Sequence, residues 1–228
     1  MPLTAVKFAS LLSYLPKRRW NEGNAGTNPD KLSQAHEYMI ALKQNRVPPS
    51  GQYSLAQLVA KQCASSGTFS EFFSRDTVLV PVPDSKRTRS DTLWVPHVLA
   101  SELKTVGLGR DIVPCLLRTV PIQKAATSAS GQRPTVKEHC DSLEMRCLFM
   151  EPPCILLIDD VVTRGTAFLA AYYKIHSAYP DAEIKAFAAM RTVLFPGEDD
   201  FRDVIDPYVG TIAPNNSHAY RSGNRKAS

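Results

Sequence analysis

The most informative stretch of this sequence is Ile155-Leu-Leu-Ile-Asp159-Asp160-Val-Val-Thr163-Arg164-Gly165-Thr166. Its apolar residues predict a buried strand, and two adjacent carboxylates follow at the carboxyl end of that strand. A short Thr/Gly turn then opens a predicted helix, so that backbone N–H groups and Thr hydroxyls converge on one point. Ligands of open α/β sheets bind at the carboxyl ends of strands. The stretch therefore predicts a phosphate site, beside which the carboxylates accept hydrogen bonds from sugar hydroxyls or hold Mg2+ through water.

The sequence around this stretch alternates apolar runs with amphipathic ones, which is typical of a parallel sheet with helices on its faces. We expect strands over 77–82, 111–117, 144–149, 154–158 and 184–190, and helices over 91–106 and 165–178. The segment 118–141 is long and has no hydrophobic periodicity, so it is predicted to be either a functional lid or disordered. The fold class that follows is α/β, with a core of mostly parallel strands flanked by helices.

The N-terminal third is predicted to be helical and to pack on this core. Its best helices cover 30–42 and 54–64, and a short amphipathic helix is expected over 8–15. The expected organisation has three parts: a helical N-terminal segment (1–75), the α/β core (76–192), and a C-terminal hood segment and tail (193–228).

The composition of the 228-residue chain is that of an ordinary globular protein, with 43% hydrophobic and 21% charged residues. This composition excludes global disorder and collagen-like or coiled-coil architecture. No apolar run approaches the roughly 18 to 20 residues that span a bilayer, so no membrane contact is expected. The five cysteines are odd in number and scattered, without metal-ligand spacing. Reduced thiols and a cytoplasmic location are the resulting expectation.

The net charge of +5 comes entirely from the N-terminal third. Residues 1–75 carry nine basic and four acidic side chains, whereas residues 76–228 carry eighteen of each. Such an excess marks either a surface that contacts single-stranded nucleic acid or an ordinary solvated face. Few aromatic residues accompany these cations, which favours the solvated face.

The acidic strand end and the Thr/Gly turn resemble the signature of the type I phosphoribosyltransferases, which bind phosphoribosyl pyrophosphate (PRPP). The resemblance implies that Asp159 and Asp160 face the ribose hydroxyls, take part in catalysis and hold Mg2+. It also implies that the 5′-phosphate is wrapped by six residues, Val161, Val162, Thr163, Arg164, Gly165 and Thr166. On the residues alone, two alternatives stay open: a Mg2+-binding carboxylate pair of a receiver-like or hydrolase-like domain, or a strand end with solvated acids.

A second stretch, Val78-Leu-Val-Pro81-Val-Pro83, is a predicted strand that ends in a rigid loop. The loop carries three cations, Lys86, Arg87 and Arg89. It resembles the pyrophosphate-binding loop of the same enzymes. The resemblance implies that Ser85, Lys86 and Arg87 bind the diphosphate of PRPP.

The Val-Pro-Val-Pro pattern of this strand resembles the ComF-like branch of the family. In that branch a strand that ends in Arg and a loop with Gln and Arg follow, and their counterparts here are Arg118, Gln123 and Arg133. Lys124 and Arg133 are then the catalytic residues of a lid that closes over the site. The sequence departs from the patterns of related enzymes at two places. The Arg-Gly-Phe-Asn-Gln stretch of the branch is absent, and Thr163 stands where 6-oxopurine enzymes carry an Asp, which disfavours purine salvage.

The resemblance as a whole implies a type I phosphoribosyltransferase-like fold with a small hood, and a glycosyltransferase activity in nucleotide metabolism. The expected reaction is Mg2+-dependent transfer of the 5-phosphoribosyl group to a nitrogen nucleophile of a small-molecule base or amine, with release of pyrophosphate. Two alternatives stay open. One is a protein that senses PRPP or a nucleotide without catalysis, and the other is a ComF-like accessory protein in DNA handling that binds single-stranded nucleic acid. A homodimer is a further expectation.

Overall fold

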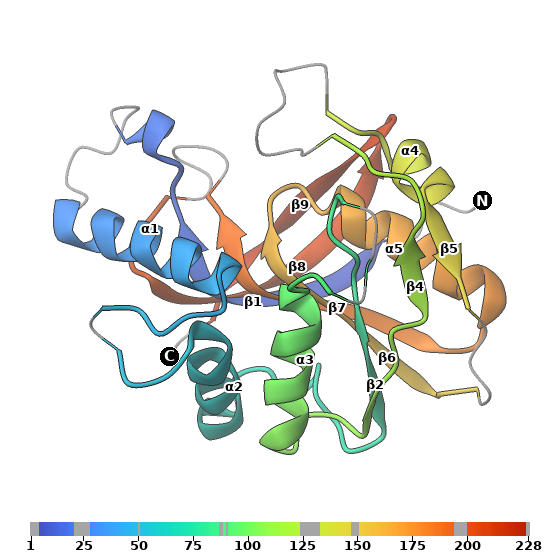
Figure 1. The fold of residues 1–228 in the computed structure, drawn as a ribbon, viewed down its shortest axis with the longest axis horizontal. Helices are drawn as coiled ribbons and strands as arrows, with labels where there is room; N and C mark the ends of the chain where they lie inside the picture. The colour runs from blue at the N-terminus through green and yellow to red at the C-terminus, as the bar shows by residue number, and fades with distance from the viewer. Residues whose placement is uncertain are drawn as a thin grey trace.

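The computed structural model describes residues 5–20, 28–49, 51–86, 89, 91–123, 133–146, 151–193 and 200–226, and the central element of this part of the chain is a seven-stranded sheet (Figure 1). Its strand order is β3-β2-β6-β7-β1-β8-β9, and a separate two-stranded sheet pairs β4 with β5. The strands are β1 (Val6–Tyr14), β2 (Thr77–Pro81), β3 (Asp111–Ile112), β4 (Leu116–Arg118), β5 (Leu143–Met145), β6 (Cys154–Val162), β7 (Glu183–Thr192), β8 (Ile205–Asn215) and β9 (His218–Arg225). The helices are α1 (Pro29–Lys43), α2 (Leu55–Ser66), α3 (Val95–Thr105), α4 (Val136–Asp141) and α5 (Thr166–Ala178), with a short 3-10 helix η1 (Lys17–Arg19).

Parallel pairing dominates the sheet and confirms the predicted fold class. Strands β3, β2, β6, β7 and β1 run parallel to one another, whereas β8 and β9 add an antiparallel hairpin at one edge. Helices α1, α2 and α3 cover one face of the sheet, and α5 covers the other face (Figure 1). The protein is therefore of the mixed α/β class, with a mainly parallel central sheet flanked by helices.

Most of the predicted elements are confirmed with small shifts at their ends. The strands expected over 77–82, 154–158 and 184–190 are β2, β6 and β7, and the helices expected over 30–42, 54–64 and 165–178 are α1, α2 and α5. The helix expected over 91–106 begins later, at Val95, because Pro96 occupies its first turn.

The strand expected over 111–117 is wrong as a single element. Its first part is β3, which pairs with β2 in the main sheet, and its second part is β4, which pairs with β5 in the small sheet. Pro114 lies between them, and a proline has no N–H group with which to continue a ladder. The chain therefore leaves the main sheet at this point. Strand β5 confirms the beginning of the strand expected over 144–149, of which residues 147–149 lie outside the described part.

The short amphipathic helix expected over 8–15 is wrong, because residues 8–14 belong to β1, which lies between β7 and β8 inside the main sheet. Strand β1 is buried on both faces, with Phe8 in the hydrophobic cluster beneath α5 and Leu11 in the cluster beneath the other helices. A strand covered on both faces is a near-continuous apolar run, and periodicity alone does not distinguish such a run from a helix. The N-terminal segment thus supplies an interior strand of the sheet as well as two helices.

Residues 205–225, expected within the C-terminal hood segment and tail, form the hairpin of β8 and β9 rather than a tail. A buried ion pair holds this hairpin to the sheet. The Arg191 guanidinium lies 2.5 Å from the Asp206 carboxylate, and the Nε atom of Arg225 lies 2.9 Å from the same carboxylate. Arg191 also lies 4.5 Å from the centre of the Tyr208 ring. The buried charges of Arg191 and Asp206 are thus paired, as burial requires.

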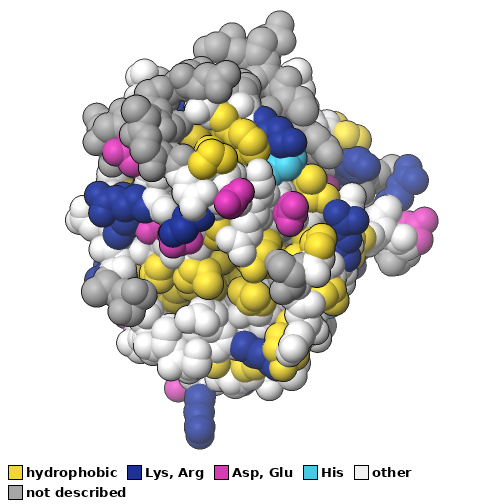
Figure 2. Space-filling view, turned by 90° about the vertical axis from the view of Figure 1, so that its left-hand side faces the viewer, with side chains coloured by type: hydrophobic (Ala, Val, Ile, Leu, Met, Phe, Trp, Pro, Cys, Tyr) yellow, Lys and Arg dark blue, Asp and Glu magenta, His cyan; other side chains and the backbone are white. Residues whose placement is uncertain are grey.

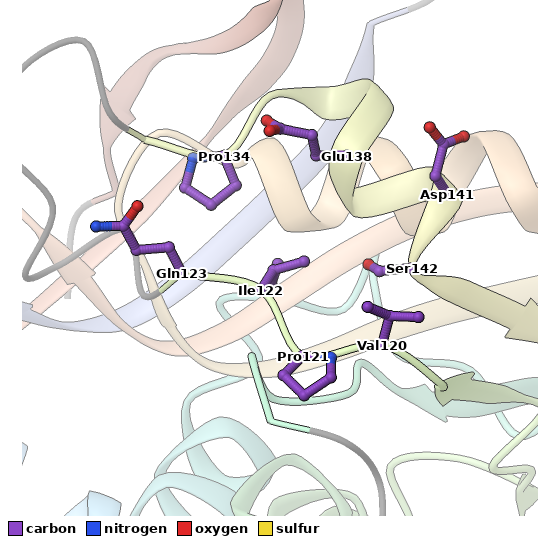
Figure 3. A pocket seen from close by; sticks show the side chains of 8 residues that line it. All are labelled: Val120, Pro121, Ile122, Gln123, Pro134, Glu138, Asp141 and Ser142. Carbon is purple, nitrogen blue, oxygen red and sulfur yellow. The ribbon is translucent and has the colours of Figure 1, made fainter.

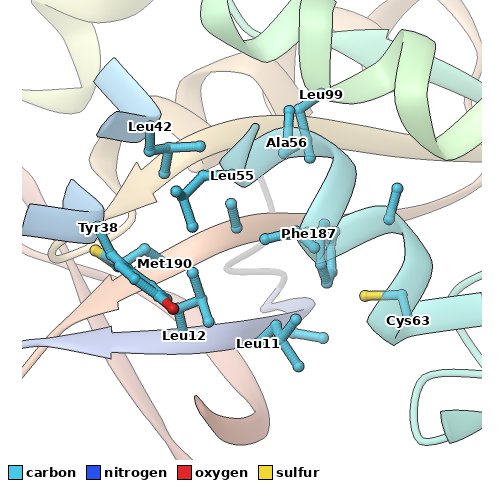
Figure 4. Packing of buried hydrophobic residues seen from close by; sticks show 14 of the residues in the cluster. Leu11, Leu12, Tyr38, Leu42, Leu55, Ala56, Cys63, Leu99, Phe187 and Met190 are labelled. Atoms are coloured by element: carbon cyan, nitrogen blue, oxygen red, sulfur yellow. The ribbon is translucent and has the colours of Figure 1, made fainter. Parts of the chain in front are cut away.

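One hydrophobic cluster joins the sheet to α1, α2 and α3 (Figure 4). Phe187 of β7 is fully buried in it, and its ring centre lies 5.7 Å from that of Phe69 and 5.1 Å from that of Phe73. Both partners belong to the segment that follows α2. Edge-to-face aromatic pairs of this kind add to the stabilisation that burial itself provides. The N-terminal third is therefore packed firmly on the sheet.

Truncation of Phe187 tests this packing. We expect Phe187→Ala to lower the free energy of unfolding by about 3–5 kcal/mol, because it leaves a cavity in place of a fully buried ring. Urea denaturation followed by circular dichroism measures the change. Leu93→Ala is the control, since Leu93 is 51% exposed and its truncation should change the unfolding free energy by less than about 0.5 kcal/mol. Equal effects of the two substitutions would contradict this account of the core.

The face at the left of Figure 1, which carries α1, is shown directly in Figure 2. Lys and Arg side chains are interspersed there with Asp and Glu and with hydrophobic side chains. Lys31 of α1, for example, pairs with Asp203. Contact of the basic N-terminal third with nucleic acid stays a prediction. Within the described ranges, no helix is both long enough and apolar enough to cross a membrane.

Candidate functional site

The carboxyl ends of β2 and β6 lie side by side, because the two strands are parallel neighbours over the whole of β2. The ladder extends one residue beyond β2 through a hydrogen bond of 2.8 Å from the Val82 N–H to the Ile158 carbonyl. The basic loop after β2 and the acidic end of β6 therefore meet at one edge of the sheet. Ser85 and Lys86 of this loop are among the described residues, whereas Arg87 lies outside them.

The two carboxylates at the end of β6 are held differently. Asp160 is only 6% exposed, and its Oδ1 atom accepts a hydrogen bond of 2.7 Å from the Val161 N–H. The Oδ1 atom of Asp159 accepts a hydrogen bond of 2.9 Å from the Asp160 N–H. The Nζ atom of Lys43 lies 2.8 Å from one oxygen of Asp160 and 2.6 Å from the other. The second acid is therefore paired with an ammonium group that comes from α1.

Lys43 was not predicted from the sequence, because no local pattern marks it. It is the last residue of α1 and lies 117 residues from Asp160 along the chain. A lysine in the last turn of a helix is usual, since it stabilises the negative end of the helix dipole. Only the packing of α1 on β1, and the pairing of β1 with β7 beside β6, brings this lysine to the acidic pair.

The acidic pair and Lys43 form one group of coupled charges. Burial and the charge of Asp160 raise the pKa of the Asp159 carboxyl well above its usual range, against an opposing effect of Lys43. Burial by itself would lower the pKa of Lys43, but the negative charges of Asp160, Asp159 and Asp84 outweigh it and raise that pKa. Burial is thus the main cause of the shift at Asp159, whereas attraction by neighbouring carboxylates is the cause of the shift at Lys43.

The turn after β6 requires a glycine. Gly165 has a φ angle of 91°, a conformation that L side chains rarely adopt, and a Cβ atom there would lie 2.7 Å from the Ile212 side chain. The hydroxyl groups of Thr163 and Thr192 lie 3.2 Å apart and connect the turn to β7. Helix α5 begins at Thr166, no side chain caps its N-terminus, and its first turn contains no acidic residue. The N–H groups of that turn are thus suited to bind an anion beside the end of β6.

The predicted phosphate loop is shorter in the structure than in the sequence pattern. Val161 and Val162 are the last residues of β6, so the turn itself is confined to residues 163–166. The Val162 side chain is buried in the cluster beneath α5, and Val161 packs partly against the other cluster. The side chain of Val162 is therefore enclosed in the core, whereas that of Val161 is partly exposed. Arg164 is half-buried in the turn.

Arg118, at the end of β4, holds the basic loop in place. It is buried, and its guanidinium donates hydrogen bonds to the carbonyl oxygens of Asp84 and Pro83 and to the Ser142 hydroxyl. Burial lowers the pKa of Arg118 to about 10, against the opposing charges of Asp84 and Asp159. The arginine that the ComF-like resemblance implied is thus a structural link between the loop and the small sheet.

The predicted lid residues are only partly described. Lys124 lies outside the described residues, and Arg133 precedes α4. A cavity of about 430 Å³ in this region is lined by Val120, Pro121, Ile122, Gln123, Pro134, Glu138, Asp141 and Ser142 (Figure 3). One lining residue, Ile122, connects the cavity to the basic loop. Its N–H donates a hydrogen bond of 2.9 Å to the Ser85 carbonyl. The lining of the cavity includes Gln123 but none of the predicted catalytic or substrate-binding residues.

The donor set at the end of β6 consists of two adjacent carboxylates, Asp159 and Asp160. The described residues contain no group of three or more His, Cys, Asp or Glu side chains that could hold a metal ion. One acid of the pair is already engaged with Lys43. Proteins commonly hold Mg2+ with one or two carboxylates together with phosphate oxygens of a substrate. The acidic pair therefore fits a Mg2+ ion that is shared with a bound diphosphate.

Similarity to known proteins is weak. The sequence matches no protein-family model and no curated protein. Among solved structures, a hypoxanthine phosphoribosyltransferase from Staphylococcus aureus is similar over 66% of this chain and 82% of that chain, with 11% sequence identity and a TM-score of 0.34. The case for a function therefore comes from the arrangement of the strand ends.

Replacement of Arg118 tests its structural role. We expect Arg118→Met to lower the free energy of unfolding by about 2–4 kcal/mol, because buried carbonyl and hydroxyl oxygens lose their donor. Urea denaturation measures the effect. Arg110→Met is the matched control, since Arg110 forms a solvent-exposed ion pair with Asp111 whose contribution should be below about 1 kcal/mol. A loss of stability no greater than that of the control would contradict the role of Arg118.

The raised pKa of Asp159 predicts a stability effect with a definite sign. A carboxyl whose pKa is higher in the folded than in the unfolded protein makes the fold less stable as the pH rises through that pKa. Asp159→Asn cannot ionise, and its side-chain oxygen can still accept the Asp160 N–H. We therefore expect the variant to be more stable than the wild type at pH 7, with a difference that shrinks on acidification. Urea denaturation over a pH series measures this difference, and a variant that is less stable at every pH would contradict the prediction.

Proposed function

We propose that this protein binds PRPP at the adjacent carboxyl ends of β2 and β6 and transfers its phosphoribosyl group to a nitrogen nucleophile of a base or amine. The observation that carries the proposal is the meeting of three features at one sheet edge: an acidic pair, a glycine turn that opens α5, and a basic loop. A sugar with a phosphate at one end and a diphosphate at the other needs this combination of hydroxyl acceptors and two anion sites.

Each feature is assigned to one part of PRPP. The turn 163–166 and the first N–H groups of α5 bind the 5′-phosphate, which the positive end of the helix dipole favours. Lys86 neutralises the diphosphate, and Ser85 beside it adds a hydroxyl donor. Asp159 and Asp160 accept hydrogen bonds from the ribose hydroxyls.

The chemistry that this arrangement serves is a displacement at C1 of the ribose. The bond between C1 and the diphosphate oxygen breaks, its electron pair leaves with pyrophosphate, and a new bond joins C1 to the nitrogen of the acceptor. The protein contributes by holding the sugar and the diphosphate in fixed positions while the acceptor approaches from the opposite face. Mg2+, held by Asp159 and Asp160 together with diphosphate oxygens, would supply positive charge to the leaving group.

Calorimetric titration with PRPP and Mg2+ tests the binding step. The wild type should bind, and the double variant Asp159→Asn, Asp160→Asn should bind at least about a hundredfold more weakly, because two hydrogen bonds to charged acceptors are lost. Asp181→Asn is the matched control, since this exposed aspartate lies between α5 and β7 at the opposite edge of the sheet. Circular dichroism checks that the double variant is folded. Undiminished affinity in a folded double variant would refute the assignment of the acidic pair.

Release of pyrophosphate tests the transfer step separately. The wild type should release pyrophosphate from PRPP in the presence of one member of a panel of purines, pyrimidines and amines. Binding of PRPP without release under any of these conditions would favour a PRPP-sensing protein. Salt-sensitive binding of single-stranded DNA without any affinity for PRPP would favour the DNA-handling alternative.

A further inference from the structure

The proposed function makes no use of the cavity between the segment 120–123 and α4. The volume of this cavity, about 430 Å³, falls in the range of small-molecule sites, which is roughly 300–1,000 Å³. In Figure 3 the segment 120–123 lies on one side of the cavity, and Pro134 and α4 lie on the other side. Two separate stretches of chain thus enclose a space that is large enough for a small organic molecule.

The lining of this cavity combines apolar and acidic side chains. Its four apolar members are Val120, Pro121, Ile122 and Pro134. Its two acidic members, Glu138 and Asp141, lie three residues apart on α4 and so project from the same side of that helix. Among the described residues that line the cavity, none is basic. The cavity therefore presents negative charge next to apolar surface.

The carboxylate of Glu138 is held in place and has an oxygen to spare. Its Oε2 atom accepts hydrogen bonds of 2.7 and 2.8 Å from the N–H and the hydroxyl of Thr135, which complete a capping box at the start of α4. These two hydrogen bonds lower the pKa of Glu138, so its carboxylate is charged at neutral pH. Both bonds use the same oxygen, and the Oε1 atom can therefore accept a hydrogen bond from a ligand.

The carboxylate of Asp141 is also accessible to a cation. It is paired at 2.5 Å with Lys137, one helical turn earlier, and the two side chains are 61% and 84% exposed. An exposed pair of this kind contributes little to stability. An ammonium or amidinium group in the cavity can therefore share this carboxylate with Lys137.

The connections of the cavity distinguish it from a site for the acceptor. The Ile122 N–H donates a hydrogen bond to the Ser85 carbonyl, and the Ser142 hydroxyl accepts one from Arg118, which also binds the Asp84 carbonyl. The cavity thus adjoins the loop that is assigned to the diphosphate. In the proposed reaction the acceptor approaches the ribose from the face opposite the diphosphate. The cavity therefore suits a molecule other than the acceptor.

We propose that this cavity is a second ligand site, which binds a small organic cation with an apolar body, such as an amine or an amidine carried by a ring. The apolar side chains pack against the body, and the carboxylates of Glu138 and Asp141 bind the cationic group. The proposal rests on the cavity and its lining, so it does not depend on the binding of PRPP.

An NMR titration of the full, 15N-labelled chain tests this site with two probes of nearly the same shape, cationic benzamidine and neutral benzamide. Benzamidine should shift the amide resonances of Ile122, Glu138 and Ser142 saturably at millimolar concentration. Benzamide should bind there about tenfold more weakly, because it forms no charge-assisted hydrogen bonds with the carboxylates.

A double variant, Glu138→Gln with Asp141→Asn, tests the role of the two charges. It should weaken the binding of benzamidine about tenfold and leave that of benzamide unchanged. A glutamine still completes the capping box, so α4 is expected to form, and circular dichroism checks the fold. Glu144→Gln is the matched control, since Glu144 is exposed on β5 and is not among the residues that line the cavity. It should bind both probes as the wild type does.

Three results would overturn the proposal. The first is the absence of saturable shifts at the cavity residues, including the case in which the shifts are confined to the end of β6. The second is equal affinity for the two probes, which would mean that the cavity does not select a cation. The third is undiminished binding of benzamidine by the folded double variant. Failure of the wild type to bind PRPP would refute the proposed function and leave this site standing.

Discussion

Two adjacent carboxylates at the end of a buried strand are the constraint on which the rest of this structure depends. A carboxylate withdrawn from water needs a counter-charge or hydrogen-bond donors, and Asp160 has both, from Lys43 and from the Val161 N–H. Helix α1 therefore cannot pack elsewhere without leaving a buried charge unpaired. Asp159 is less well compensated, so its pKa is raised. The two adjacent carboxylates therefore lower the stability of the fold, but they place several hydrogen-bond acceptors close together.

The hairpin of β8 and β9 also contacts the carboxyl end of β6. These contacts lie on the face of the sheet opposite α1. Arg221 of β9 donates hydrogen bonds of 3.3 and 2.6 Å to the carbonyl oxygens of Val162 and Thr192, the last residues of β6 and β7. Ile212 of β8 fills the space next to Gly165, where a larger residue would collide with it. These contacts satisfy backbone acceptors at the point where the two ladders end. Both the N-terminal and the C-terminal segments are therefore parts of the central sheet and of the region around the end of β6.

Arg118 and Lys43, two cations near the acidic pair, differ in burial and in the groups that they contact. Arg118 is 1% exposed, and its guanidinium donates hydrogen bonds to oxygen atoms of Asp84, Pro83 and Ser142. Lys43 is half-exposed and is paired with the buried carboxylate of Asp160. A planar guanidinium suits several fixed carbonyl oxygens, whereas a compact ammonium suits a single carboxylate. Their similar charge therefore supports different functions.

The sequence by itself determined the features that depend on one continuous segment: the apolar strand and acidic end of β6, the glycine turn before α5, the strand β2 with its basic loop, and most of the helices. Those patterns are local, so a short window contains all the information. Only the tertiary structure decided that residues 8–14 form an interior strand, because an apolar run suits a buried helix and a buried strand equally until its neighbours β7 and β8 are known. Only the tertiary structure likewise brought Lys43 to Asp160, across 117 residues of sequence. An ion pair between distant segments leaves no periodicity, and its partners are selected by the packing of the helix that carries one of them.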